Sequence, residues 1–432
     1  MIVCKFGGSS VASAKQLEKV KSIVEADNRR QIVVVSAPGK RDSSDIKVTD
    51  LLYSCCKEVK EFGTCDKSFS LIEKRFFEIL QDLNLETDLM AKALAEIKEV
   101  INLNANENFA ASRGEYLNAI LVSQYLGFEF VDAADLIVIN DNGYVDDKTW
   151  EIINEKLDKD KKYIIPGFYG RNKNDVITTF SRGGSDISGA IFAKAMNATL
   201  YENWTDVAGC YNADPRFIKK AYPIETMTYK EVRELSALGA SVFHADAIAP
   251  VRQEGIAINI KNTNDIAAKG TMIVSSKETD GPVGVSQIGT YSKLTCRKLM
   301  LNKEAGTINT IHSVVRSYGI NPMYMTHGVD TFSFIFDKND ISEKSLDELK
   351  QRFFTDFNVD EIEVENDLAL VGIVGQNINR DFIYYKKCVD ALYDNNIKIY
   401  QSLAESSTIS ILFIVNDSEA KKAVEVIFDV LF

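Results

Sequence analysis

Apolar and polar positions follow two alternating patterns in the first part of the chain. Residues 2–6 and 31–38 (QIVVVSAP) are short, apolar and rich in β-branched side chains, which is typical of buried strands. Residues 17–24 and 69–83 instead place apolar side chains at the spacing of one helix face. Further strand-like runs read DLIVIN, KKYIIPGFYG, DVITTF, ATLYENWT and IAINIKN. Strands alternating with helices predict an α/β fold with a mostly parallel sheet, whose ligands bind at the carboxyl ends of the strands.

The chain after residue 290 has a different pattern, and this pattern occurs twice. Residues 314–337 (VVRSYGINPMYMTHGVDTFSFIFD) read as a helix end, a turn, a strand, a polar break and a second strand, and residues 391–415 repeat this order. A helical run follows each copy, which predicts two small modules of the βαββαβ kind. The second copy lacks a closing strand, and we expect residues 359–366 (VDEIEVEN) to supply it. Such modules favour a regulatory role, with dimerisation alone as the alternative.

Composition and charge narrow the class of protein. The 432 residues are 45% hydrophobic and 26% charged, as in ordinary globular proteins, and the net charge of −12 argues against a nucleic-acid binder. The sequence contains no apolar run long enough for a membrane span and no secretory signal, so we expect a cytoplasmic protein that does not bind membranes. The seven cysteines are scattered and the three histidines lack metal-ligand spacing, so we expect reduced thiols and no metal held by the protein.

The stretch KFGGSS is a glycine-rich turn between a predicted strand and a predicted helix. Gly7 and Gly8 lie where backbone N–H groups can approach an anion, and Lys5 adds an ammonium group beside them. Ser9 or Ser10 is a candidate cap of the following helix. The alternative is a purely structural glycine turn with a lysine that reaches the solvent.

The stretch SRGGSD forms a second turn of the same kind. Arg182 stands beside Gly183 and Gly184, an arrangement suited to a carboxylate or a phosphate. Asp186 has a simpler interpretation as a residue that stabilises the start of a helix. Two such turns, each with a cation, favour a site for a nucleotide and a second anion. Neither turn matches the P-loop or the dinucleotide-binding fingerprint.

Five motifs in this order resemble those of the aspartokinases in the amino acid kinase family. They read KFGGSSV, VVVSAPGK with KVTDLL, SRGEYLNA, SRGGSDISGA and WTDVAGCYNADPR. The repeated tail resembles the tandem ACT modules of the same enzymes, so the resemblance covers essentially the whole chain. It implies a three-layer α/β/α kinase domain over residues 1–285 and ACT-like modules over residues 290–362 and 363–432. The chain stops after the second module, so we expect a monofunctional enzyme without a fused homoserine dehydrogenase.

The resemblance implies ATP-dependent phosphorylation of the β-carboxylate of L-aspartate to 4-phospho-L-aspartate, the first step of lysine, threonine and methionine biosynthesis. Lys5 would contact the transferring phosphoryl group, and Asp186 would orient Lys5 and the acceptor. Arg182 would bind the α-carboxylate of aspartate, and Glu115 would bind its ammonium group. Further substrate contacts are implied for Ser36, Thr49 and Ser185.

For the nucleotide, the resemblance implies ATP with Mg²⁺, the metal being held mainly by phosphate oxygens and water. Phosphate contacts are implied for Gly7, Gly8, Ser9 and Arg216, and ribose or adenine contacts for Thr205, Asp206 and Tyr211. The chain departs from the family at one point. Many members carry an ATP-contacting lysine in a GAKVLHP segment, whereas this chain reads GASVFHADA, with Ser241 and Ala245 at the matching positions. Ser241 is therefore not a candidate site residue.

For regulation, the resemblance implies an amino-acid effector at an interface between ACT-like modules. The candidate positions are Met300, Asn321, Met323 and Thr326. Lysine is the first expectation, because inhibition by lysine is common in the family. Threonine is the second, because Met323 replaces the aspartate that usually holds the lysine ammonium group. We also expect a homodimer or a dimer of dimers that assembles through these modules.

Two other functions remain open at this stage. Another amino acid kinase, acting on glutamate, acetylglutamate or a nucleoside monophosphate, would share the sheet and the glycine-rich turns, but KFGGSS and the tandem tail favour aspartate. A binding protein that senses amino acids through an inactive kinase domain is the second alternative. The presence of Lys5, Arg182 and Asp186 argues against it.

Overall fold

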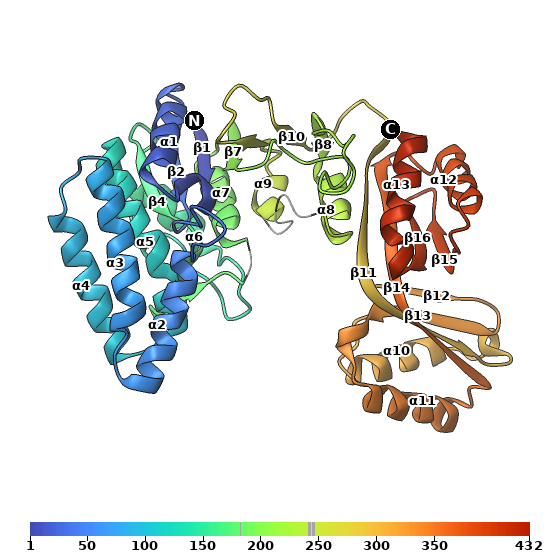
Figure 1. The fold of residues 1–432 in the computed structure, drawn as a ribbon. Coiled ribbons are helices and arrows are strands. Elements are labelled where there is room, and N and C mark those ends of the chain that lie inside the picture. The colour runs from blue at the N-terminus through green and yellow to red at the C-terminus, as the bar shows by residue number, and fades with distance from the viewer. Residues whose placement is uncertain (182, 241–242, 244–246) are drawn as a thin grey trace. The chain divides into compact units, whose positions relative to one another are not determined.

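The protein is described by a computed structural model that covers residues 1–181, 183–240, 243 and 247–432 (Figure 1). The chain divides into two compact units. The first comprises Met1–Tyr211, Pro223–Ser236 and Ser241–Glu278, and the second comprises Asn212–Tyr222, Ala237–Ala240 and Thr279–Phe432. The two units therefore interleave along the sequence. The predicted domain limits near residues 285, 290 and 362 stay a prediction.

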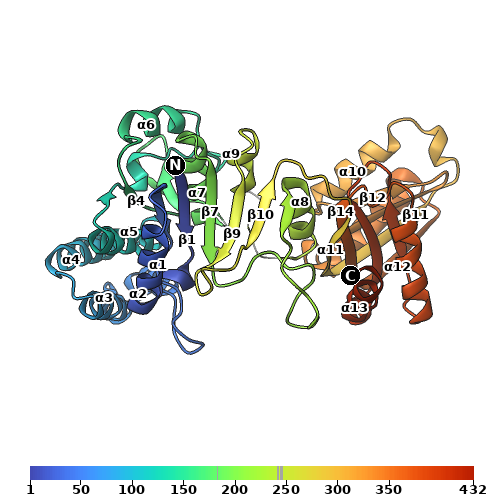
Figure 2. The same cartoon turned by 90° about the horizontal axis from the view of Figure 1, so that it is seen from above.

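An eight-stranded sheet forms the centre of the first unit, in the order β3-β4-β2-β1-β7-β9-β10-β8 (Figure 2). Neighbouring strands are parallel except for β9 and β10, which are antiparallel. The strands are β1 (Ile2–Phe6), β2 (Arg30–Val35), β3 (Glu129–Phe130), β4 (Tyr163–Pro166), β7 (Leu200–Thr205), β8 (Thr226–Thr228), β9 (Ile258–Asn262) and β10 (Thr271–Val274). The mostly parallel α/β sheet agrees with the sequence prediction.

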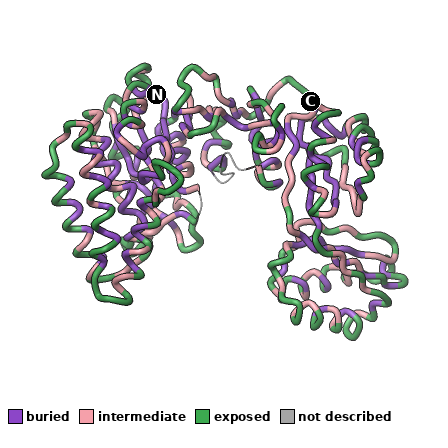
Figure 3. Tube along the Cα trace, viewed as in Figure 1, coloured by how far each residue is buried: buried purple, intermediate pink, exposed green. Residues whose placement is uncertain are grey.

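Helices cover both faces of this sheet. The helices are α1 (Ala14–Glu25), α2 (Val48–Phe62), α3 (Asp66–Asp82), α4 (Asp88–Leu103), α5 (Glu107–Leu126), α6 (Lys148–Lys156), α7 (Gly184–Ala195), α8 (Tyr229–Ala237) and α9 (Ile248–Arg252). Helices α1 to α5 share a core with Cys4 and Phe6 of β1, whereas α7 packs against β1, β2 and β7. Successive side chains of a strand point to opposite faces, so Lys5 points to the side of α7. Figure 3 shows the buried residues gathered in the strands and along one side of the helices.

Two of the predicted strands differ from the structure. DLIVIN (residues 135–140) begins at the end of a short 3₁₀ turn, Ala133–Asp135, and its Val138 and Ile139 make only isolated bridges. The segment DVITTF contributes β6 (Ile177–Thr179), which pairs with β5 (Tyr169–Arg171) in a separate hairpin. Both segments bury apolar side chains by packing rather than by joining the central sheet.

The seven cysteines are free and buried, as predicted. Among the described residues, no helix combines the length and the apolarity needed to cross a bilayer.

The second unit contains one antiparallel six-stranded sheet, in the order β12-β13-β11-β14-β16-β15. Its strands are β11 (Gly281–Arg297), β12 (Tyr324–His327), β13 (Thr331–Asp337), β14 (Glu361–Gln376), β15 (Gln401–Ala404) and β16 (Ser410–Asn416). Its helices are α10 (Thr307–Ser317), α11 (Glu343–Phe357), α12 (Ile383–Asp394) and α13 (Ala420–Leu431). The helices form two separate cores, with α10 and α11 in one and α12 and α13 in the other, as two ACT-like modules require.

The strand that completes the second module differs from the prediction. Residues 281–289 of β11 pair with residues 369–376 of β14 in the second module, and residues 293–297 pair with residues 361–365 in the first. The predicted segment VDEIEVEN therefore lies beside the first module, and the completing strand precedes that module in the sequence. Two long strands run through both modules, which a search for local strand patterns does not detect.

Candidate active site

Lys5 and Asp186 form an ion pair at the carboxyl end of β1. Their Nζ and Oδ1 atoms lie 2.6 Å apart, and their side chains are only 10% and 16% exposed. Asn203 is the neighbour of Lys5 on β7, and its Nδ2 donates to Asp186 Oδ1 at 2.7 Å. The Tyr201 hydroxyl donates to the Asp186 backbone carbonyl at 3.0 Å. Asp186 lies in the first turn of α7, where it pairs with Lys5, so its role goes beyond starting a helix.

The glycine-rich turn after β1 lies against the chain that follows β2. Gly7 N donates to Trp204 O at 3.0 Å, and a Cβ on Gly7 would lie 3.4 Å from Lys5 Nζ. Gly39 N donates to Gly8 O at 2.9 Å, and a Cβ on Gly39 would lie 2.7 Å from the Gly8 carbonyl carbon. Only glycine permits this approach.

The predicted cap at Ser9 or Ser10 is wrong. Residues Gly8–Val11 form a short 3₁₀ helix, so α1 begins only at Ala14. Ser10 is buried and its hydroxyl bonds that of Thr263 at 2.8 Å.

Glu115 lies on α5 against the end of β2. It is only 5% exposed, and its carboxylate accepts a hydrogen bond from Ala37 N–H. Burial raises the pKa of this carboxyl to about 8, although the bond from Ala37 and the charge of Arg113 lower it. Oε2 is buried and has no hydrogen-bond partner among the described residues. Gly114 allows the helix to approach, because a Cβ there would lie 2.7 Å from that of Ala37.

Ser36 and Thr49 lie around the same stretch of chain. Ser36 O accepts a hydrogen bond from Asn118 Nδ2 at 2.7 Å. Thr49 is half-buried in the first turn of α2, where Val48 N donates to Pro38 O at 3.3 Å. The structure thus brings Ser36, Thr49 and Glu115 together around Ala37 and Pro38.

The second glycine-rich turn reaches the site through α7. Ser185 is buried, and a Cβ on Gly167 would lie 2.8 Å from its Oγ, so α7 packs closely on the chain after β4. Arg182, Ser241 and Ala245 lie outside the described residues.

The residues predicted to bind the nucleotide fall into both units. Thr205 ends β7, exposed Asp206 follows, and Tyr211 bridges to Pro223 in the first unit. Arg216 belongs to the second unit, its side chain is 87% exposed, and its Nε donates to Asp214 Oδ2 at 2.9 Å. Arg216 thus belongs to a different unit from the other three residues.

The four candidate effector residues lie in the first ACT-like module. Met300 has a left-handed backbone (φ 63°), and its N donates to Asp330 Oδ1 at 2.8 Å. Asn321 is exposed, and Met323 N donates to Ile335 O at 2.7 Å. Thr326 lies on β12, and its hydroxyl accepts from Gln401 Nε2 at 3.3 Å.

Sequence reasoning missed two groups in this region. Asn203 lies inside an apolar strand, where only the register with Lys5 reveals its role. Arg113 is part of SRGEYLNA, and its guanidinium carbon lies 4.5 to 5.0 Å from the ring centroids of Phe109, Tyr116 and Tyr169. Its Nη2 has no hydrogen-bond partner in the described part of the chain. Within that part, no three histidine, cysteine or carboxylate side chains gather as a metal site.

Comparison with known proteins places this geometry in a family. The model of the amino acid kinase family matches residues 1–262. Aspartokinase 3 of Bacillus subtilis is 34% identical, with 100% of this chain and 99% of that protein covered. The crystal structure of aspartate kinase from Clostridium acetobutylicum, described as an allosteric enzyme, is 39% identical, with 100% of both chains covered and a TM-score of 0.91.

A more distant relative has the same fold. The structure of E. coli aspartokinase III with aspartate and ADP has a TM-score of 0.80 at 23% identity, with 100% of both chains covered. This chain therefore belongs to the amino acid kinase family and is one of its aspartokinases.

Proposed function

We propose that the protein transfers the γ-phosphoryl group of ATP to the β-carboxylate of L-aspartate and releases 4-phospho-L-aspartate and ADP. The observation that carries this proposal is the ion pair between Lys5 and Asp186. It lies at the carboxyl end of a parallel sheet, beside one glycine-rich turn and in the first turn of the helix that follows the other. Parallel sheets bind ligands at this edge, and phosphoryl transfer needs a cation at this position.

Lys5 neutralises the negative charge that spreads over the transferring group, while backbone N–H groups of Gly8 and Ser9 cradle the phosphates. The Gly7 N–H is held by Trp204 O, so Gly7 contributes by leaving space for the phosphates beside the Lys5 ammonium group. Asp186 and Asn203 hold the ammonium group of Lys5 in place. Asp186 need not act as a base, because the attacking β-carboxylate is already ionised at neutral pH. Catalysis then rests on position and charge.

Glu115 binds the ammonium group of aspartate, and Arg182 binds the α-carboxylate as a bidentate pair. The buried, unpartnered Oε2 of Glu115 supports the first assignment, because a cation there would offset the cost of burying a carboxylate. The other substrate contacts come from Ser36, Thr49 and Ser185.

Thr205, Asp206 and Tyr211 contact the ribose and the base of ATP, and Arg216 contacts a phosphate after releasing Asp214. Mg²⁺ enters with ATP and is held by phosphate oxygens and water. Its chemistry is to neutralise the phosphate charge.

An amino acid made downstream of aspartate inhibits the enzyme by binding at Met300, Asn321, Met323 and Thr326. Lysine is the first candidate and threonine the second. The edge position of β12, which pairs only with β13 in the described sheet, supports assembly of two chains through these modules.

A coupled ADP-release assay tests the proposal directly. L-aspartate should support turnover, whereas glutamate, acetylglutamate and nucleoside monophosphates should not. Turnover with glutamate in place of aspartate would assign a different amino acid kinase. Binding of aspartate without ADP release at high enzyme concentration would instead indicate an inactive sensor.

A further inference from the structure

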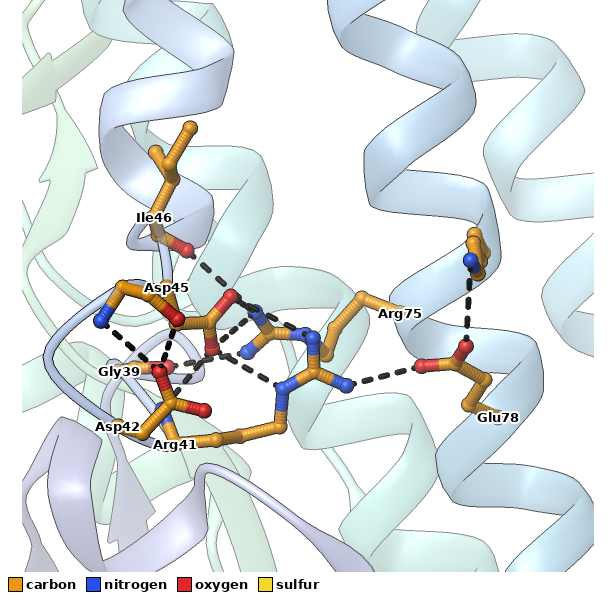
Figure 4. A network of polar contacts seen from close by, with 9 residues as sticks. Gly39, Arg41, Asp42, Asp45, Ile46, Arg75 and Glu78 are labelled. Carbon is orange, nitrogen blue, oxygen red and sulfur yellow. Dashed lines mark hydrogen bonds and ion pairs between the residues drawn. The ribbon is translucent and has the colours of Figure 1, made fainter.

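Arg75 makes a buried polar network on α3, outside the residues assigned above (Figure 4). The residue is only 4% exposed, although arginine is rarely buried without a reason. Its Nη1 donates to Gly39 O at 3.1 Å, and its Nη2 donates to Ile46 O at 3.4 Å and to both carboxylate oxygens of Asp45. All of these bonds end on the connection between β2 and α2.

The two ends of this connection meet the candidate active site. At its start, the Ala37 N–H bonds the Glu115 carboxylate and Gly39 packs on Gly8. At its end, α2 begins with Val48 and Thr49. Arg75 binds the connection near both ends at once, which a planar guanidinium with several donors can do and an ammonium cannot.

Asp45 supplies the opposite charge in this network. Its side chain is 12% exposed and also accepts Arg41 Nε at 3.0 Å and Arg41 N at 2.9 Å. These partners hold the pKa of the Asp45 carboxyl well below its usual range, although burial opposes this. The carboxylate therefore stays charged, and the buried guanidinium keeps its partner.

We infer that Arg75 is a positioning residue for aspartate binding, which it supports by holding Gly39, Asp45 and Ile46. It touches no substrate itself. It fixes the backbone that carries the Ala37 N–H and Thr49, and small displacements of such groups weaken a site. The inference rests on the proposed function, because it concerns the site assigned to aspartate.

The test compares steady-state kinetics of the wild type with Arg75→Met, Arg75→Lys and a control. In Arg75→Met, the KM for aspartate should rise about tenfold or more, while the KM for ATP changes less than about threefold. Arg75→Lys should fall between wild type and Arg75→Met, because lysine can pair with Asp45 but cannot span the connection. Arg75→Lys also tests the inference if Arg75→Met does not fold.

Glu78→Gln is the matched control. Glu78 lies on the same helix and pairs with Arg41 at 2.9 Å, but its side chain is 40% exposed and has no bond to Gly39, Asp45 or Ile46 among the described contacts. Its kinetic constants should stay within about twofold of wild type, as expected for an exposed ion pair.

A readout without turnover separates positioning from general stability. Amide hydrogen exchange over residues 39–48 should accelerate in Arg75→Met and in Arg75→Lys but not in Glu78→Gln, with thermal unfolding recorded for each. Folded Arg75 variants with wild-type aspartate KM would overturn the inference and leave the proposed function intact. Equal rises of both KM values would also overturn it. A wild-type enzyme that releases no ADP with aspartate would overturn both.

Discussion

Asn203 stands beside Lys5 in the parallel register of β7 and β1, and both side chains reach Asp186. The three residues come from β1, α7 and β7, and 198 positions of the sequence separate Lys5 from Asn203. Asp186 accepts from both neighbours, so the position of the Lys5 ammonium group depends on a neutral amide as well as on its charged partner. This relationship yields the first two predictions.

Lys5→Ala should lower kcat by about 100- to 1,000-fold or more, because it removes a charge that stabilises the transition state. Circular dichroism should show an unchanged fold. Lys15→Ala, at an exposed lysine on α1, is the control. Near-normal kcat for the Lys5 variant would remove the central claim of the proposed function.

Asn203→Ala should lower kcat by about tenfold and leave both KM values within about threefold, because Asp186 and Lys5 keep their charges but lose a neutral hydrogen bond. Stopped-flow or steady-state measurements of ADP release give kcat and the two KM values separately. A rise in KM for ATP with constant kcat would show instead that Asn203 acts on nucleotide binding.

Glu115→Gln should raise the KM for aspartate much more than the KM for ATP. In the wild type, the carboxyl with its pKa of about 8 must lose its proton to pair with the substrate ammonium, so the aspartate KM should fall as the pH rises toward 8. The Gln variant should lose this dependence. The control Glu107→Gln, which changes an exposed residue on the same helix, should keep the pH dependence of the KM for aspartate. Wild-type aspartate KM that is flat between pH 6 and 8 contradicts the assignment.

Glu115 should also affect stability in a definite direction. Its pKa of about 8 in the folded protein exceeds the ordinary value of 4.5, so the folded state holds a proton that the unfolded chain releases. Its contribution is fully present below about pH 4.5 and is lost as the pH rises to about 8. Urea unfolding should therefore show Glu115→Gln gaining free energy of unfolding relative to wild type over this interval. A constant difference would mean that the carboxyl titrates normally.

The full-length enzyme should be inhibited by lysine or by threonine, alone or together. Thr326→Val should raise the inhibitor concentration needed for half-inhibition, because it removes the hydroxyl that links β12 to Gln401. Titration of ADP release with each amino acid measures the effect, and kcat without inhibitor should stay unchanged. If neither lysine nor threonine inhibits the wild type, alone or together, the ACT-like modules serve assembly alone.

The local pattern predicted the strand that contains Lys5, the strand that ends at Thr205 and the helix that begins before Asp186, because buried strands and glycine-rich turns are visible in neighbouring residues. It did not predict Asn203 beside Lys5, because that contact depends on strand order and register. The contact of Glu115 with Ala37 needs the close approach at Gly114, which is a long-range packing event.

The completing strand of the second module was wrong in the prediction for the same reason, because it depends on strand pairing. Its completing strand at residues 281–289 is far from residues 369–376 in the sequence, and it belongs to a strand that continues into the first module. Patterns of alternation reveal that a segment is extended but do not reveal its partner.

The segment Asn212–Tyr222 has a practical consequence for protein engineering. Ala213 and Ile218 are buried in the core of the second ACT-like module, and Leu238 lies against Gly372, although all three precede the modules in the sequence. A regulatory half exchanged between two aspartokinases by a single crossover near residue 280 would leave these side chains facing a foreign core. A functional chimera must carry three pieces of chain, residues 212–222, 237–240 and 279–432, from the same parent.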